Sequence, residues 1–203
     1  PTATTPPSND LPCSATSLVV SSSCTMSTFD NTYATSSSGV PAPGCNLYTG
    51  EDVWFSATVP SSGNIAFTTS SGQITDAGMA IYSGSCSSLS LIECNADRAD
   101  GKMPKIVLTN QTPGSTILAR VWAFGQSEYG TFNICAYEPT PATNSHPCNA
   151  IYINPQSSCV FSTFSNQEAA STSFVLNPSC GIYKGADVWF KTRIPASGVL
   201  NID

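Results

Sequence analysis

The sequence repeats itself with a fixed period of 135 residues. The tetrapeptide DVWF stands at 52–55 and again at 187–190, and each copy leads into a proline and then Ser-Gly. Three cysteines recur at the same distance, so that positions 13, 24 and 45 correspond to 148, 159 and 180. Aligning residues 9–68 with 144–203 without a gap gives roughly 26 identities in about 60 positions, a self-similarity typical of repeat architectures. We therefore expect one module followed by the start of another.

The period also predicts domain boundaries. Residues 1–8 form a Pro/Thr-rich linker, 9–138 a complete repeat, 139–143 a second linker, and 144–203 the N-terminal part of a second, truncated repeat. Proline-rich joints favour an extended, semi-rigid backbone, so tandem modules of this kind are expected to form a stalk. Because the second copy would stop in mid-strand, we expect the sequence to be a fragment of a longer repeat protein.

Short β-branched and aromatic runs, separated by Gly, Pro, Ser and Asn, predict strands throughout the first copy. No segment keeps a helical period over ten residues. With one or two strands expected in residues 15–40, the total is about eight to nine, which indicates an all-β fold of antiparallel β-sandwich or jelly-roll-like repeats in tandem. The other expected strands are 53–59, 65–68, 78–82, 105–108, 116–123 and 130–137.

Composition excludes several classes of partner. Only seven Lys and Arg are present among 203 residues and the net charge is -6, so no basic surface is expected for nucleic acid. No apolar run approaches the length of a membrane span. Nine cysteines in a chain with 10 % charged residues indicate an oxidising, extracellular or cell-surface location.

Spacing and the repeat suggest a disulfide pattern. Cys24 and Cys45 both precede DVWF, Cys86 and Cys94 flank what is expected to be a short loop, and the remaining two cysteines bracket the module. The expected pairs are Cys13–Cys135, Cys24–Cys45, Cys86–Cys94 and Cys159–Cys180. Cys148 would then seek a partner near position 270; the alternative is a free reactive thiol.

Residues for catalysis are scarce, and we expect no enzyme. The single histidine, His146, occupies the position of Leu11 in the first copy, so the repeat does not preserve it. Asp52 and Asp187 are either ligands or, as we favour, acceptors for backbone amides in a turn. Trp54 is either a platform for a sugar or, as we favour, a core anchor.

Two further candidate sites are predicted. Calcium prefers six to eight oxygen ligands, and Asp76, Asn95, Asp97 and Asp100 could supply some of them, although a solvated turn is the ordinary alternative. The expected hairpin loop after 116–123 mixes aromatic and polar groups, and loops on a rigid sandwich are common recognition sites. The expected ligand contacts are Trp122, Phe124, Gln126 and Tyr129.

Several motifs occur in the order found in one bacterial family. They are Pro-Cys-x-Ala at 12–15, Pro-x-Cys at 43–45, DVWF with Pro-x-Ser-Gly, AIYSGSC at 80–86, LIECN at 91–95, TPGS at 112–115 and GTF at 130–132. This series resembles a module of large secreted proteins of the Bacteroidota, in the β-sandwich class that includes pre-peptidase C-terminal domains. The resemblance implies export, often by the type IX system, and a place in stalks, adhesins or accessory domains of hydrolases. Relatives often carry a more acidic loop where this chain has Ala96, which weakens a calcium site.

The leading hypothesis is a non-enzymatic, extracellular repeat protein, a segment of an adhesin, stalk or filament whose neighbouring repeats accumulate weak contacts. One alternative is a carbohydrate-binding accessory module of a secreted hydrolase, with surface glycans as partners. Another is a filament of like subunits assembled by strand complementation.

Overall fold

The computed structural model describes residues 5–45, 48, 50–96, 102–124, 129–172, 175–176, 178–179 and 185–202. The chain divides into two compact units, residues 1–139 and 140–203. Each unit is described by itself. No helix in the described part is long and apolar enough to cross a membrane.

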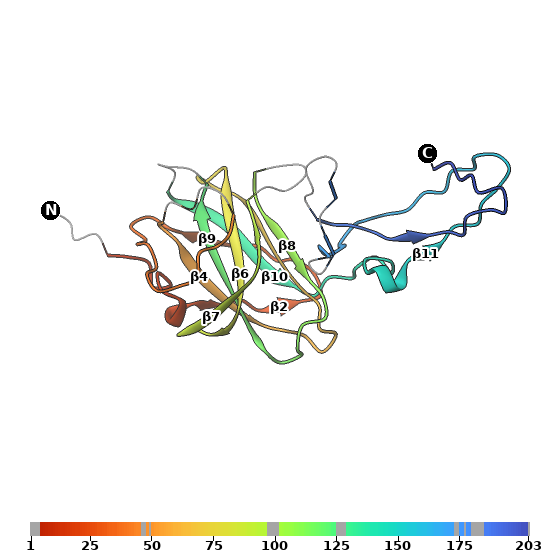
Figure 1. Ribbon diagram of the computed structural model, residues 1–203. Coiled ribbons are helices and arrows are strands. Elements are labelled where there is room, and N and C mark those ends of the chain that lie inside the picture. Colours follow the sequence, from red (N-terminus) through yellow and green to blue (C-terminus); the bar gives the residue numbers. More distant parts are fainter. Residues whose placement is uncertain are drawn as a thin grey trace. The chain divides into compact units, whose positions relative to one another are not determined.

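The first unit is a sandwich of two five-stranded sheets (Figure 1). One sheet has the order β1-β4-β9-β6-β7, and the other has the order β2-β10-β5-β8 with β3 also paired to β10. A short 3-10 helix, η1 (Pro12–Ser14), precedes the strands. The strands are β1 (Thr16–Ser17), β2 (Val20–Ser21), β3 (Ser27–Asp30), β4 (Val53–Thr58), β5 (Ile65–Ser71), β6 (Ala77–Ser85), β7 (Ser88–Asn95), β8 (Lys105–Leu108), β9 (Thr116–Ala123) and β10 (Thr131–Tyr137).

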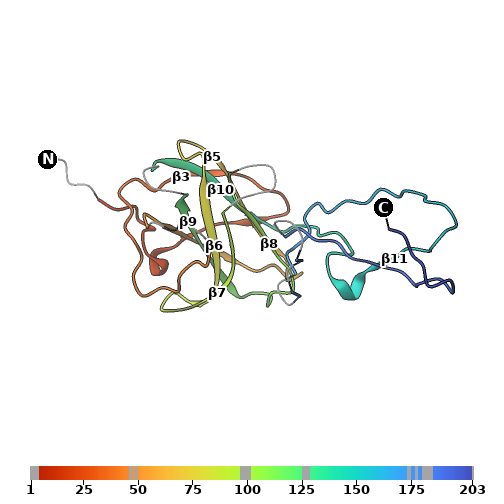
Figure 2. The ribbon, with the colours of Figure 1, turned by 45° about the horizontal axis from the view of Figure 1, so that its top comes forward.

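The predicted all-β sandwich is confirmed, and most ladders are antiparallel. Strands β8 and β9 have the bounds expected from the sequence. Parallel pairing occurs at the start of the unit, where β1 pairs with β4 and β2 pairs with β10. Strands β3, β5 and β10 lie together in the second sheet, with β10 between the other two (Figure 2). Residues 15–40 hold three short strands where one or two were expected.

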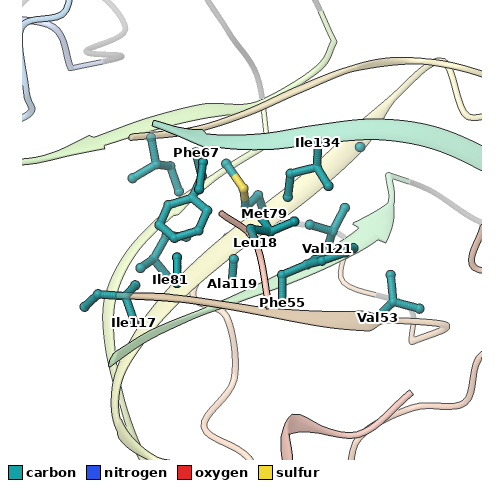
Figure 3. Packing of buried hydrophobic residues seen from close by; sticks show 14 of the residues in the cluster. Leu18, Val53, Phe55, Phe67, Met79, Ile81, Ile117, Ala119, Val121 and Ile134 are labelled. Carbon is teal, nitrogen blue, oxygen red and sulfur yellow. The ribbon is translucent and has the colours of Figure 1, made fainter. Parts of the chain in front are cut away.

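The hydrophobic core fills the space between the two sheets. Alternate residues of each strand point inward because side chains on a strand alternate between its two faces. Phe55 of β4, Met79 of β6 and Ile134 of β10 are fully buried in this core and meet between the sheets (Figure 3). Phe55 also makes edge contacts with Phe29 and Phe132, with ring centroids 4.7 and 6.0 Å apart.

The first sheet is covered on its outer face as well, which explains why the side chains of β4 and β9 are largely buried on both sides. Trp54, Tyr82 and Trp122 belong to a second buried cluster, together with Ala80 and Leu118. The loop before β4 lies over this face and contributes Val40, Cys45 and Tyr48 to it. Trp54 is therefore a core anchor, as favoured from the sequence.

The expected disulfide pattern is wrong. The structure pairs Cys13 with Cys86, Cys24 with Cys135, and Cys45 with Cys94, at Cα separations of 4.9, 5.6 and 5.7 Å. Cys148 and Cys159 are exposed free thiols, and Cys180, the expected partner of Cys159, lies outside the described residues.

The expected Cys86–Cys94 pair is wrong because the residues between these cysteines form strand β7 and not the short loop that was expected. Residues 88–95 form the second arm of a β6–β7 hairpin, and Cys86 lies in its turn while Cys94 pairs with Ala80 far along the strand. The intervening strand spans about 26 Å, whereas a disulfide needs Cα atoms within about 7 Å. Cys24 lies between β2 and β3, and because both pair with β10 it meets Cys135 there rather than Cys45 or Cys13.

The second unit repeats part of this arrangement. It has a 3-10 helix η2 (Pro147–Asn149) and two short strands, β11 (Ile151–Tyr152) and β12 (Phe190–Lys191), which pair in parallel. Ile151 faces Phe190, just as Thr16 faces Phe55 in the first unit. In the described part of this unit, β12 pairs with β11 alone.

Candidate functional site

A buried ion pair lies on the outer face of the first sheet. The side chains of Arg120 in β9 and Asp52, the residue before β4, are 1 % and 0 % exposed. Arg120 donates from Nε to Asp52 Oδ2 at 3.0 Å and from Nη2 to Asp52 Oδ1 at 3.2 Å. The strand register brings the two together, because Arg120 faces Trp54 across the β4–β9 ladder.

Three further residues donate hydrogen bonds to the Asp52 carboxylate. Tyr48 donates its hydroxyl to Oδ1, and Ser37 donates its backbone N–H to Oδ1 and its hydroxyl to Oδ2. The Trp54 indole N–H donates to Oδ2 at 2.8 Å. Asp52, Arg120, Tyr48, Ser37 and Trp54 together are called the outer cluster below.

Aromatic rings enclose the guanidinium group of the outer cluster. The Arg120 guanidinium carbon lies 4.0 Å from the Tyr48 ring centroid and 5.3 Å from that of Trp54. Such cation–π contacts are strongest when both groups are shielded from water. Tyr82, packed against Trp54, donates its hydroxyl to the Pro41 carbonyl at 3.0 Å. The outer cluster therefore fastens the loop before β4 onto the sheet.

The electrostatics of the outer cluster favour the charged pair. Burial alone would raise the pKa of the Asp52 carboxyl, but the hydrogen bonds from Arg120 and Tyr48 and the Arg120 charge outweigh it and lower that pKa below its usual value. Burial, followed by the hydrogen bond to Asp52, raises the pKa of Tyr48. Burial would lower the pKa of Arg120, yet Asp52 raises it. Asp52 is thus an anion and Tyr48 a neutral donor at ordinary pH.

These contacts assign the outer cluster a structural role. The preference for Asp52 as an acceptor of backbone amides is confirmed by the Ser37 N–H, and Asp187 accepts the Thr172 N–H at 3.2 Å. Arg120 was not among the residues predicted from the sequence. A usable signal was present, since Arg120 is the one charged residue in the alternating strand 116–123. A lone charge among apolar residues on a sandwich strand needs a buried partner of opposite sign.

A second candidate site lies at one end of the sandwich, where two exposed tyrosines stand on adjacent loops. Asn31 joins these loops: its backbone N–H donates to the Gly130 carbonyl and its Oδ1 accepts from the Gly130 N–H at 2.9 Å. Tyr33, two residues after Asn31, is 58 % exposed, and Tyr129, beside Gly130, is 60 % exposed. The arrangement presents two aromatic faces to solvent.

The second unit reproduces local contacts of the first. The Asn144 side chain donates to the Trp189 carbonyl at 3.0 Å, as Asn9 does to Trp54. The Trp189 indole donates to Asp187 Oδ2 at 2.8 Å, and Thr172 takes the place of Ser37. Matching residues at the 135-residue spacing thus make matching hydrogen bonds.

Comparison with known proteins shows the family. Residues 8–133 match the model of a family described as galactose binding domain-like and associated with type IX secretion. The chain belongs to this family. No curated protein matches it. Among solved structures, the pre-peptidase C-terminal domain of a collagenase from Bacillus anthracis is similar, with 11% identity and a TM-score of 0.39, and the match covers 60% of this chain and 93% of that chain.

Membership confirms the resemblance to a disulfide-stapled β-sandwich module. Three disulfides, together with the association of the family with type IX secretion, indicate an extracellular module. Domains of this galactose binding domain-like type are typically accessory modules.

One of the predicted ligand contacts, Trp122, is wrong. Trp122 is fully buried, with its ring edge-on to Tyr48 at 5.4 Å, because its position in β9 faces the outer cluster. It is therefore no surface contact. Phe124 is half-buried and Tyr129 is exposed, while Gln126 lies outside the described residues.

The predicted calcium ligands are only partly described. Asp76 forms an ion pair with Lys102 at 3.7 Å, and Asn95 donates its side-chain N–H to the Lys105 carbonyl at 3.2 Å. Asp97 and Asp100 lie outside the described residues. Among the residues that are described, no group of three or more His, Cys, Asp or Glu could hold a metal ion, and the calcium site stays a prediction.

Proposed function

We propose that this galactose binding domain-like module is a load-bearing spacer of an extracellular adhesin, stalk or filament, without catalytic activity of its own. The observation that carries the proposal is the Cys24–Cys135 disulfide. It joins the start of the sandwich to its last strand, only a few residues before the unit ends at 139. Tension applied along the chain therefore passes through this covalent bond and bypasses strands β3 to β9, which lie between its two cysteines.

The bond takes most of the module out of the load path. It closes a loop of 111 residues, so the strands between its cysteines cannot be pulled out while it is intact. Hydrogen-bonded strands alone can open locally under load. A module built in this way keeps its length under tension, which is what a spacer between a cell surface and its attachment point requires.

Single-molecule pulling on the full chain, held at both ends, tests this function. Under oxidising conditions we expect no extension step from the strands between Cys24 and Cys135, whereas reduction should release a step of about 390 Å, given about 3.5 Å per extended residue over 111 residues. A step of that size in the oxidised chain would contradict the proposal.

Paired variants identify which bond carries the load. Replacing Cys24 and Cys135 by serine leaves Cys13–Cys86, so the chain that follows Cys86 becomes extensible as far as position 135, which is 135 − 86 = 49 residues. This corresponds to a step of about 170 Å. The matched control, Cys13→Ser with Cys86→Ser, should show no step, because that bond lies outside the load path. Equal steps in both double variants would overturn the assignment.

A second candidate function is glycan binding, favoured by the two tyrosines at the end of the sandwich. Exposed aromatic faces can stack on the apolar face of a sugar ring, and the family description points the same way. A screen against galactose-containing and other surface glycans should then give saturable binding that Tyr129→Ala and Tyr33→Ala each reduce. Exposed Tyr152, in the second unit, provides the control, since Tyr152→Ala should leave glycan binding unchanged.

A further inference from the structure

Strand β7 forms one edge of the first sheet, and disulfides hold it at both ends. In the described part of the first unit, β7 pairs with β6 alone. Cys86, in the turn before β7, is bonded to Cys13, and Cys94, near the far end of β7, is bonded to Cys45. Because both ends are fixed, β7 is an ordered template, and a strand that adds to it causes little further loss of conformational entropy in β7.

The backbone groups of Leu89 and Leu91 point toward the outer edge of β7. Along a strand these groups alternate between its two neighbours. The hydrogen bond from the Phe124 N–H to the Asp76 carbonyl joins the end of β9 to the start of β6, so even-numbered residues of β6 face β9 and odd-numbered ones face β7. Ser90 pairs with an odd-numbered residue of β6 and is therefore turned toward β6. Its neighbours Leu89 and Leu91 direct their N–H and C=O groups away from β6.

This part of β7 has none of the features that usually prevent pairing at an edge. Sheets commonly carry charged side chains, proline or a β-bulge on their exposed edges. Residues 82–92 contain no charged residue and no proline, and the bulge of the β6–β7 ladder comes only after Leu91. Ser88 and Ser90 are exposed, and Leu91 is 38 % exposed. The edge from 88 to 91 is thus accessible to another strand.

We propose that β7 pairs antiparallel with β7 of a second copy of this chain, about a two-fold axis at Ser90. This register places Leu89 of each copy opposite Leu91 of the other, so that every outward N–H and C=O group of these leucines meets a partner. The same edge supplies both halves of the contact, as a two-fold interface requires. Since residues 82–92 are uncharged, the two copies do not repel each other where they touch.

Sedimentation equilibrium of the full chain measures this pairing. The free thiols, which include Cys148 and Cys159, are first alkylated so that no disulfide can link two copies. The unaltered chain should dimerise reversibly between about 10 μM and 1 mM. Dimerisation should be stronger at higher salt, because salt screens the net charge of -6 that each copy carries. A chain that stays monomeric at about 1 mM would overturn the proposal.

Substitutions at Ser90 test the register. In the proposed dimer the two copies of Ser90 lie directly opposite each other, where like charges repel and opposite charges attract. Ser90→Lys and Ser90→Glu should each dimerise more weakly than the unaltered chain. An equimolar mixture of the two variants should dimerise about tenfold more tightly than either variant alone. This recovery also shows that both variants are folded.

The matched control is Ser61→Lys, which adds the same charge at an exposed serine in the turn before β5. This variant should dimerise like the unaltered chain. The proposal would be overturned if Ser90→Lys dimerised as tightly as Ser61→Lys, because the contact would then lie elsewhere. It would also be overturned if the mixture of Ser90→Lys and Ser90→Glu dimerised no more tightly than the single variants.

Discussion

Arg120 and Asp52 are the two residues on which the outer face of the module depends most. Each would lose its hydration on burial, and each recovers the loss through the other and through Tyr48, Ser37 and Trp54. Removal of one partner from a buried pair leaves an uncompensated charge, which is far more costly than loss of the whole pair. The stability of the loop before β4 therefore depends on both charges together.

The first prediction follows from this asymmetry. Arg120→Met should lower the free energy of unfolding by about 3–5 kcal/mol, because Asp52 remains buried without its cation. The double variant Arg120→Met with Asp52→Asn should recover part of that loss. Lys102→Met is the matched control: Lys102 is 70% exposed in its pair with Asp76, so its loss should cost at most about 1 kcal/mol. Equal losses in urea denaturation for Arg120→Met and Lys102→Met would contradict this account.

The second prediction concerns pH. The folded-state pKa of Asp52 is lower than its ordinary value of 3.8, so the unfolded chain binds the proton more readily. The stability that Asp52 contributes is fully present above about pH 4 and is lost as the pH falls through the lower, folded value. Urea midpoints measured from pH 6 to pH 2 should fall less steeply for Asp52→Asn than for the unaltered chain. If the urea midpoints of both chains fell in parallel with pH, Asp52 would not be the cause of the pH dependence.

At the level of elements, the loop before β4 and the β6–β7 hairpin decide the architecture of the outer face. Cys45 in the loop is bonded to Cys94 in β7, so the loop is fastened covalently beside the outer cluster. This bond closes 49 residues. The loop is thereby a cover for the first sheet rather than a free connection.

The third prediction tests this cover. Replacing Cys45 and Cys94 by serine should cost about 2–4 kcal/mol of unfolding free energy, since the unfolded chain regains loop entropy. Amides of residues 35–37, whose protection depends on Asp10 and Asp52, should exchange faster in the native state. Faster exchange in the core strand β5 instead, with 35–37 unchanged, would show that the bond does not hold the loop.

The sequence predicted the long strands well because alternation and the flanking turns are local signals. Strand β9 is an example, with its inward residues 117, 119, 121 and 123 all buried. Strand β7 was not predicted because its serines and half-exposed side chains do not form a clear apolar face. The cysteine pairs and the Asp52–Arg120 contact join segments far apart in the chain, and only the order of strands within the sheets determines them. The local spacing of residues therefore could not predict the cysteine pairs or the Asp52–Arg120 contact.

For the whole molecule, covalent connectivity determines how the module responds to force. The three disulfides join segments 49 to 111 residues apart, and the longest of them links the two ends of the sandwich. A covalent path through Cys24–Cys135 makes the length of the module independent of the strength of strands β3 to β9. The load-bearing proposal requires this one bond.

The most direct measurement is a map of the native disulfides. Peptic digestion at acid pH suits it, because thiolates are scarce there and exchange between disulfides is slow. Mass spectrometry without reduction should recover the peptide of Cys24 linked to that of Cys135, with Cys13 linked to Cys86 and Cys45 to Cys94. Recovery of Cys135 linked to Cys86 or Cys94 would leave no direct bond between the start of the sandwich and its last strand, and would contradict the central claim.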